Sequence, residues 1–183
     1  MRYVALLRAL NVGGNRIVKM DALKAFFESA GLANVKTFIA SGNVLFDSPR
    51  KPLALETHIE KHLHQALGYE VATFVRSAAE IEEAARFAPF ADEQGASRYV
   101  GFLKEPLSAK ARGFVTGSKG KLDDFAFAGR ELHWLCRGPF LESEFQPGRL
   151  EKTFGVRATL RNINTVRKLA ALANAAPAAK GRR

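Results

Sequence analysis

The sequence predicts a mixed α+β fold built from two similar halves. The opening stretch R-Y-V-A-L-L-R at 2–8 recurs as R-Y-V-G-F-L-K at 98–104. Each half then carries a hairpin signal, and the halves close alike, with L-G-Y-E-V-A-T-F-V-R at 67–76 and F-G-V-R-A-T-L-R at 154–161. A matched start, hairpin and end in the same order indicates an internal duplication. The predicted element order of each half, β-α-β-β-α-β, is that of a ferredoxin-like subdomain.

The elements of the first half follow from the spacing of its apolar residues. Apolar residues four positions apart, such as Leu55, Ile59 and Leu63, predict a helix, and short apolar runs bounded by turn residues predict strands. Gly31 and Gly68 stand where helices commonly end. The predicted elements are a strand at 3–7, a helix at 20–30, strands at 35–40 and 44–47, a helix at 52–67 and a strand at 71–76.

The same patterns predict the second half. Ser108 is a suitable N-cap for its first helix, and Asn164 for its last one. The final strand alternates, so that Arg157, Thr159 and Arg161 share one face. The predicted elements are a connecting helix at 77–87, a strand at 99–104, a helix at 108–115, hairpin strands at 125–127 and 132–136, a short helix at 148–154, a strand at 156–161 and a helix from 164.

These elements divide the chain into four predicted segments. They are a first α+β subdomain at 1–76, a connecting helix and loop at 77–96, a second subdomain with its C-terminal helix at 97–173, and a basic tail at 174–183. The tail is rich in alanine, so we expect it to be flexible, because it can bury too little apolar surface to order itself.

The positive charge of the chain is concentrated near its two ends. The formal net charge is +10; residues 1–50 carry seven Lys or Arg against three Asp or Glu, and residues 137–183 carry ten against three. The stretch between them is close to neutral. A body of this charge favours polyanionic partners such as nucleic acid.

Other features of the composition predict the compartment. The single cysteine, Cys136, cannot form an internal disulfide, which fits a reducing cytosol. The apolar run after Arg2 is too short for a signal peptide, and no stretch is apolar enough to cross a bilayer. We therefore expect a cytoplasmic protein without a membrane partner.

Three polar turns form the predicted ligand site. A glycine pair between a strand and a helix can present backbone N–H groups to a phosphate, and Asn and Arg side chains add further donors. The candidate ligand-binding residues are Arg8, Asn11, Gly13, Gly14, Asn15, Ser41, Asn43, Arg161, Asn162 and Asn164. The alternative is a purely local role for these residues, in turns and a helix cap. If the three turns meet in space, a shared anion site is the better interpretation.

No catalytic residue, metal ligand or cofactor is predicted. His58 and His62 lie one helical turn apart, but no third ligand accompanies them, and a solvated flank of the helix explains both. No nucleophile elbow and no cysteine with a placed histidine occurs. Tyr3 and Tyr99 occupy matched strand positions, as in sheets that stack nucleobases, although the aromatic-rich strand signature of that class is missing.

Three stretches, in order, resemble a known family. R-Y-V-A-L-L-R-A-L-N-V-G-G-N at 2–15, S-G-N-V-L-F at 41–46 and A-T-L-R-N-I-N-T-V-R-K-L at 158–169 are similar to signatures of the bacterial domain-of-unknown-function 1697 family. The chain departs from that pattern at Ala9-Leu10, where members usually have Gly-Ile, and at Ile163, where an aromatic residue is usual. The resemblance implies a cytosolic α+β protein of two similar subdomains and no particular activity.

Two functions of different classes follow. The first is non-catalytic binding of nucleic acid or another polyanion through the basic, Asn- and Gly-rich loops. The phosphate backbone would be contacted by Arg157, Arg161, Arg167, Lys168 and the basic tail. The alternative is an enzyme or sensor for a small phosphorylated ligand bound at the same loops. A third possibility is an interaction module whose charge serves only solubility. The oligomeric state is left open.

Overall fold

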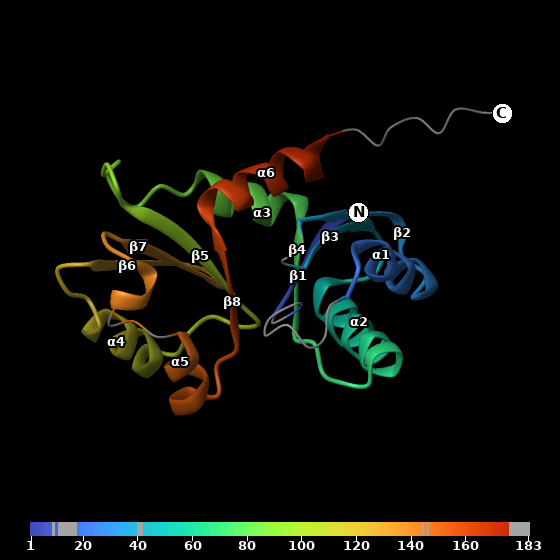
Figure 1. Ribbon diagram of the computed structural model, residues 1–183, viewed down its shortest axis with the longest axis horizontal. Coiled ribbons are helices and arrows are strands. Elements are labelled where there is room, and N and C mark those ends of the chain that lie inside the picture. Colours follow the sequence, from blue (N-terminus) through green and yellow to red (C-terminus); the bar gives the residue numbers. More distant parts are fainter. Residues whose placement is uncertain (9, 11–17, 40–41, 144, 146, 176–183) are drawn as a thin grey trace. The chain divides into compact units, whose positions relative to one another are not determined.

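The computed structural model describes residues 1–8, 10, 18–39, 42–143, 145 and 147–175 of the chain. Over these residues the fold is mixed α+β, with two four-stranded antiparallel sheets and six α-helices (Figure 1). The chain divides into two compact units. One is Met1–Glu82 together with the stretch that begins at Lys168, and the other is Glu83–Arg167.

The first unit contains one sheet with a central first strand. Its elements are β1 (Arg2–Leu7), α1 (Met20–Ser29), β2 (Ala33–Phe38), β3 (Asn43–Asp47), α2 (Pro52–Leu67) and β4 (Thr73–Ser77). The strand order is β2-β3-β1-β4, and β1 pairs antiparallel with both neighbours. Val4 of β1 lies opposite Leu45 of β3 on one side and Arg76 of β4 on the other.

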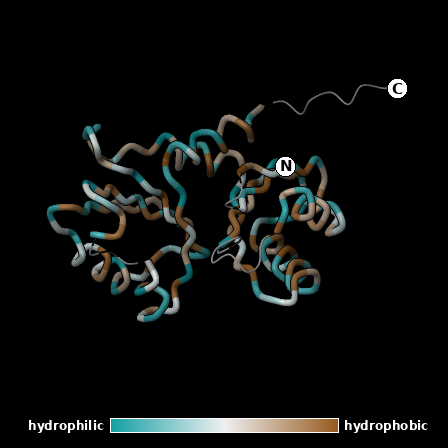
Figure 2. The backbone as a smooth tube through the Cα atoms, in the orientation of Figure 1, coloured by the Kyte–Doolittle hydropathy of each residue, from teal (hydrophilic) through white to brown (hydrophobic). Residues whose placement is uncertain are grey.

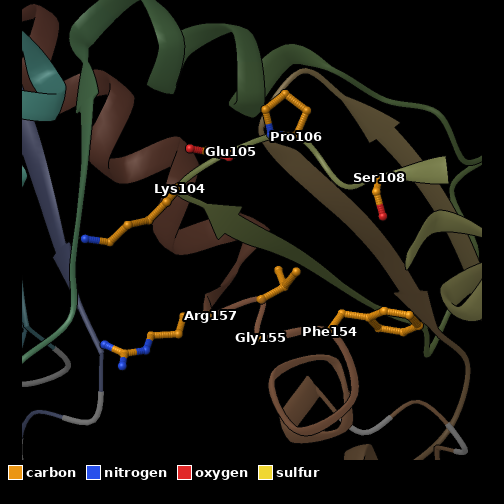
Figure 3. Close-up of a pocket in the computed structure, with 8 residues that line it drawn as sticks. Lys104, Glu105, Pro106, Ser108, Phe154, Gly155 and Arg157 are labelled. Atoms are coloured by element: carbon orange, nitrogen blue, oxygen red, sulfur yellow. The ribbon is translucent and has the colours of Figure 1, made fainter. Parts of the chain in front are cut away.

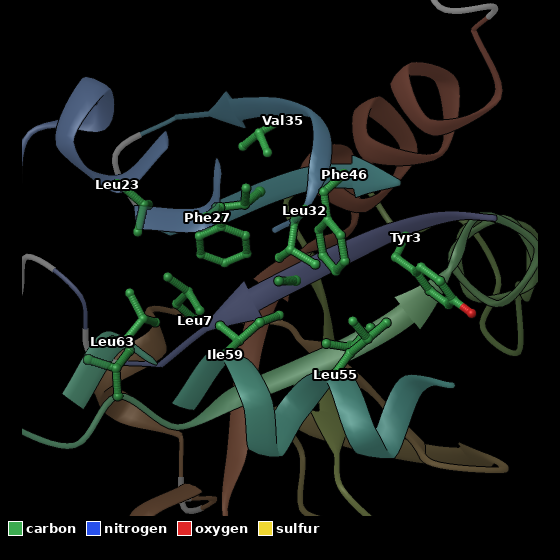
Figure 4. Packing of buried hydrophobic residues seen from close by; sticks show 14 of the residues in the cluster. Tyr3, Leu7, Leu23, Phe27, Leu32, Val35, Phe46, Leu55, Ile59 and Leu63 are labelled. Carbon is green, nitrogen blue, oxygen red and sulfur yellow. The ribbon is translucent and has the colours of Figure 1, made fainter. Parts of the chain in front are cut away.

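Helices α1 and α2 cover one face of this sheet. Leu55, Ile59 and Leu63, at four-residue spacing on α2, point toward β1 and are at most 1% exposed (Figure 4). Along α2, apolar residues recur among polar ones every three to four positions, as expected for an amphipathic helix (Figure 2). Burying an aliphatic side chain of this size contributes about 1.5–3 kcal/mol, so this stripe is a main source of the unit's stability.

Gly42, the residue immediately before β3, has a conformation that favours glycine. Its φ is +77°, and its carbonyl accepts a hydrogen bond of 2.8 Å from the Leu7 backbone N–H. A Cβ atom at this position would lie 2.9 Å from the Leu7 Cβ atom. Both the dihedral angle and the space at the end of β1 therefore require glycine here.

The second unit contains a sheet with the same kind of connections. Its elements are β5 (Ser97–Leu103), α4 (Ala109–Gly117), β6 (Asp123–Ala128), β7 (Glu131–Cys136), the 3₁₀-helix η1 (Phe140–Glu142), α5 (Pro147–Phe154) and β8 (Ala158–Asn162). The strand order is β6-β7-β5-β8. Val100 of β5 lies opposite His133 of β7 on one side and Arg161 of β8 on the other. Helices α3 (Ala78–Arg86) and α6 (Ile163–Asn174) each contain a boundary between the two units.

A buried carboxylate organises the core of the second unit. Asp123 is 1% exposed, and its Oδ1 accepts a hydrogen bond of 2.6 Å from the Trp134 indole N–H. The hydroxyl of Ser143 lies 2.9 Å from both carboxylate oxygens and accepts a 3.0 Å bond from the Phe145 N–H. The Phe145 ring packs edge-on against Trp134 at 5.2 Å. One carboxylate thus ties the start of β6 to β7 and to the segment after η1.

Several element boundaries differ from the sequence-based predictions. The strand predicted at 125–127 begins at Asp123, since the pairing with β7 extends to Cys136. The last helix begins at Ile163, and its cap is Asn162, because the Asn162 Oδ1 accepts a 2.9 Å bond from the Asn164 N–H. The cap predicted at Asn164 is therefore wrong by two residues.

The segment boundaries also differ. Residues 77–82, predicted to be part of a connector, and the stretch from Lys168, predicted to belong to the second subdomain, both group with the first unit. Leu169, Ala170 and Ala173 of α6 are buried, and the Asn174 side chain donates a 3.1 Å hydrogen bond to Glu82 of α3. The predicted tail lies outside the described residues from 176 onward.

We predict that Asp123→Ala destabilises the protein strongly. The substitution leaves the buried N–H of Trp134 and the hydroxyl of Ser143 without their acceptor, which costs about 3 kcal/mol. Urea unfolding followed by tryptophan fluorescence measures the loss. Asp124→Ala is the matched control, because its ion pairs with Lys119 and Arg137 lie near the surface, and we expect a loss of less than about 1 kcal/mol. Equal losses for the two variants would contradict this role of Asp123.

Candidate functional site

The structure describes five of the ten predicted ligand-binding residues. Arg8 and Asn43 lie in the first unit, and Arg161, Asn162 and Asn164 in the second. The remaining predictions lie outside the described residues; they are Asn11, Gly13, Gly14, Asn15 and Ser41. Because the two units are described individually, the described residues are taken in two groups.

Arg8 and Asn43 lie at the same end of the first sheet. The Arg8 backbone N–H donates a 2.9 Å bond to Ala72, which continues the pairing of β1 with the chain before β4. Asn43 lies opposite Leu6, is fully buried, and donates a 3.0 Å bond from Nδ2 to the Phe38 carbonyl. Asn43 therefore closes the β2–β3 turn, the local role considered above as the alternative.

Arg161 is buried rather than presented to solvent. The predicted alternation of β8 holds, but its polar face is the more buried one: Thr159 is 5% and Arg161 8% exposed. The guanidinium donates bonds of 2.8 Å to the Thr159 hydroxyl and 2.9 Å to the Leu160 carbonyl. Burial lowers the pKa of Arg161 to about 10, so that it remains charged at neutral pH. Asn162, next in sequence, is occupied as the cap of α6.

A pocket of about 550 Å³ opens in the second unit where β5 ends and β8 begins. It is lined by Lys104, Glu105, Pro106, Ser108, Phe154, Gly155, Val156 and Arg157. Figure 3 shows the charged ends of Lys104 and Arg157 extending to the same side of the pocket, with Ser108 and Phe154 on the opposite side. Its volume is in the range typical of small-molecule sites.

The electrostatics of this pocket are mixed but include two cations. Half of the Arg157 side chain is exposed, and its Nε atom lies 3.4 Å from a carboxylate oxygen of Glu151. Ser108 accepts a 3.2 Å bond from the Ala111 N–H, which confirms it as the N-cap of α4. Cations on one side and a hydroxyl and an aromatic ring on the other suit a ligand with a phosphate and a less polar body.

Sequence reasoning did not assign this pocket, although two signals were present. Lys104 matches Arg8 in the repeated opening pattern, and Arg157 was predicted as a contact to phosphate. The sequence does not show that the loop before α4 lies next to the end of α5. The pocket forms only because these two segments, about fifty residues apart in the sequence, come together. No local pattern encodes such a contact.

The paired histidines of α2 have a structural role. The His58 Nε2 lies 2.8 Å from the Ala30 carbonyl, and the His62 Nε2 lies 2.9 Å from the Ser29 hydroxyl. Both rings therefore bind the C-terminal end of α1, instead of forming the purely solvated flank that was predicted. Among the described residues, no group of three or more His, Cys, Asp or Glu side chains is placed to hold a metal ion.

Base stacking by Tyr3 is not possible in this structure. Tyr3 lies on the helix-covered face, is 3% exposed, and donates a 2.9 Å hydrogen bond to the Arg50 carbonyl. Tyr99 is half-buried, and its ring lies 5.1 Å from that of Trp134. The hypothesis is thus wrong for Tyr3, and Tyr99 belongs to an aromatic cluster of the core.

A second, much smaller cavity lies beside His133, and we call it the His133 slot. It measures about 10 Å³, and its lining includes Phe87, Phe90, Arg98, His133 and Arg167. His133 is 3% exposed, and its Nε2 atom has no hydrogen-bond partner among the described residues. Burial lowers the pKa of His133 to about 4, so that the imidazole is neutral at pH 7. Sequence reasoning assigned no role to His133, because a histidine in a strand gives no local signal.

The comparisons with known proteins agree with the fold. The family model described as "Protein of unknown function (DUF1697)" matches residues 1–133, and the chain belongs to this family. No curated protein matches the chain. It is similar to a solved structure, described as that of the conserved bacterial protein SP0830 from Streptococcus pneumoniae, with a TM-score of 0.78 and 21% identity over 94% of this chain and 98% of that one. At this identity the similarity concerns the fold alone. No helix in the described part of the chain is long and apolar enough to span a membrane.

We predict that His133 makes the stability of the protein depend on pH. Because its pKa is lowered from 6.5 to about 4 by folding, the folded state favours the neutral ring. About 3 kcal/mol of the free energy of unfolding therefore depends on the protonation state of His133. This stability is fully present above pH 6.5 and is lost as the pH falls from 6.5 to about 4.

The measurement is urea unfolding of the wild-type protein and of His133→Phe at a series of pH values. The carboxylates affect the pH dependence of stability equally in both proteins. The difference between the two plots of stability against pH therefore isolates the effect of His133. We expect the wild-type protein to lose more stability than the variant across this range. Parallel curves would show that His133 is not a buried neutral group.

Proposed function

We propose that the protein binds nucleic acid or another polyanion without catalysing a reaction. The observation that carries this proposal is the exposure of the cations in the most basic part of the chain. Arg157, Arg167 and Lys168 are exposed, within a stretch in which ten Lys or Arg stand against three Asp or Glu. Exposed cations of this kind attract phosphate backbones irrespective of sequence. Arg161, which is buried, is better assigned to holding β8 than to contacting a ligand.

A specific observation favours the alternative, a small phosphorylated ligand. It is the pocket between the ends of β5 and β8, since a concave site of about 550 Å³ is larger than a backbone phosphate requires. Lys104 and Arg157 would bind the phosphate, and Ser108 and Phe154 the remainder of the molecule. In this case the protein is a sensor or enzyme for that ligand, and its general basicity is secondary.

We also propose that the two units are ferredoxin-like repeats that arose by duplication. The strand orders β2-β3-β1-β4 and β6-β7-β5-β8 support this proposal, as does the register, in which Val4 and Val100 each face a buried arginine. Gly68 and Gly155 add to it, because each follows a helix with a positive φ shortly before an edge strand. A cytoplasmic location and the absence of a membrane partner remain predictions.

Two double variants separate the two functions. One is Lys104→Gln with Arg157→Gln, in the pocket, and the other is Arg167→Gln with Lys168→Gln, on α6. Polyanion binding predicts that both pairs lower the affinity for a single-stranded oligonucleotide and each reduce the salt slope by up to about 1.4, since each lost contact contributes about 0.7.

Binding of a small phosphorylated ligand predicts a different result. In that case only the double variant in the pocket lowers the affinity for the oligonucleotide, and the double variant on α6 binds it as the wild-type protein does. Fluorescence anisotropy at three salt concentrations gives both quantities. Wild-type affinity and slope in both double variants would rule out both assignments of the site.

A further inference from the structure

The unpartnered nitrogen of His133 requires an explanation. Native proteins pair nearly all buried polar atoms, and the exceptions commonly mark a bound water, a ligand or a functional group. His133 lines a cavity of about 10 Å³, roughly the space of one water molecule. A buried side chain with an unpartnered polar atom thus lines a preformed space.

The side chain that covers His133 in the slot is partly exposed. The Phe87 ring packs edge-on against the imidazole with 4.6 Å between ring centroids, yet Phe87 is 40% exposed. It belongs to residues 87–96, a stretch that forms neither helix nor strand and in which most residues are exposed. Displacing this ring would disturb a surface loop and leave the core of the unit intact.

Cations border the same slot. Arg98 lies on β5, two residues before Val100, and therefore shares a sheet face with His133. Its guanidinium binds the carboxylate of Asp92, whose own side chain is 96% exposed. Arg167 of α6 also lines the slot and helps to lower the pKa of Asp92, after the larger effect of Arg98. Four separate segments thus bring two arginines, a neutral imidazole and aromatic rings together.

We propose that the His133 slot is a binding site for an unpaired nucleobase of single-stranded nucleic acid. The base would replace the Phe87 ring against His133, with the imidazole Nε2 hydrogen-bonded to the base edge and with Arg98 and Arg167 beside the adjoining phosphates. This combination of an aromatic surface, one hydrogen-bonding atom and flanking arginines is the chemistry by which proteins bind extruded bases. The inference rests on the proposed binding of nucleic acid and adds a requirement for the base.

The test compares two ligands that differ only in their bases. They are a mixed-sequence single-stranded DNA of ten nucleotides and an abasic oligomer of the same length and charge. We expect the full-length protein to bind the first at least about tenfold more tightly, because stacking of even one base contributes that much. Equal affinities for the two oligomers would refute base binding in the His133 slot, while the proposed binding of polyanions would stand. Absence of binding to both oligomers would overturn the proposed function together with the slot.

Two variants locate the effect. His133→Phe keeps an aromatic ring but removes the hydrogen-bonding atom, so the preference for the base-containing oligomer should fall severalfold with unchanged affinity for the abasic one. Phe87→Ala removes the cover at an exposed position and should raise the preference. A thermal unfolding curve verifies that each variant is folded. If both variants are folded and prefer the base-containing oligomer as strongly as the wild-type protein does, the base binds elsewhere and the assignment is refuted.

Discussion

The structure depends on two central strands, β1 and β5, which pair on both sides. Every side chain from Tyr3 to Leu7 is at most 3% exposed, so neither face of β1 tolerates a shift in register. A shift by one residue would exchange the faces of the whole strand. The pairing also places one arginine opposite each central valine, Arg76 beside Val4 and Arg161 beside Val100. Arg76 lies 3.9 Å from a carboxylate oxygen of the buried Glu56 and also donates a hydrogen bond to the Val75 carbonyl. Arg161 donates to the Leu160 carbonyl and to the Thr159 hydroxyl. These partners compensate for the burial of both guanidinium groups.

The two buried bases of the second unit have different consequences. Val100 separates His133 from Arg161 on one sheet face, and burial lowers the pKa of both side chains. Arg161 keeps its charge and donates to its own strand, whereas His133 is neutral and keeps an unpartnered nitrogen. The buried arginine thus bonds to the sheet edge, whereas the histidine is the residue on which the proposed nucleobase site rests. In the proposed function, cations that are open to solvent, such as Arg157 and Arg167, supply the long-range attraction for an anion.

Elements formed by nearby residues could be predicted from the sequence, and contacts between distant residues could not. The i, i+4 stripe of Leu55, Ile59 and Leu63 predicted α2, because helix amphipathicity is a local property, and Pro52 and Gly68 marked its ends. The role of Asp123 and the slot beside His133 were missed, because each depends on partners brought close only by the fold. Arg161 shows the intermediate case: alternation assigned its face correctly, but burial of that face depends on tertiary packing.

The central claim is that the folded body of the protein, rather than its basic terminus, binds phosphate. The most direct test measures the affinity of a chain ending at residue 175 for a single-stranded oligonucleotide at several salt concentrations. The account predicts that binding persists and that log K falls linearly with log salt concentration, with a slope of about −0.7 per phosphate contacted. Loss of binding together with residues 176–183 would contradict it, since the charges of the body would then have no role in recognition.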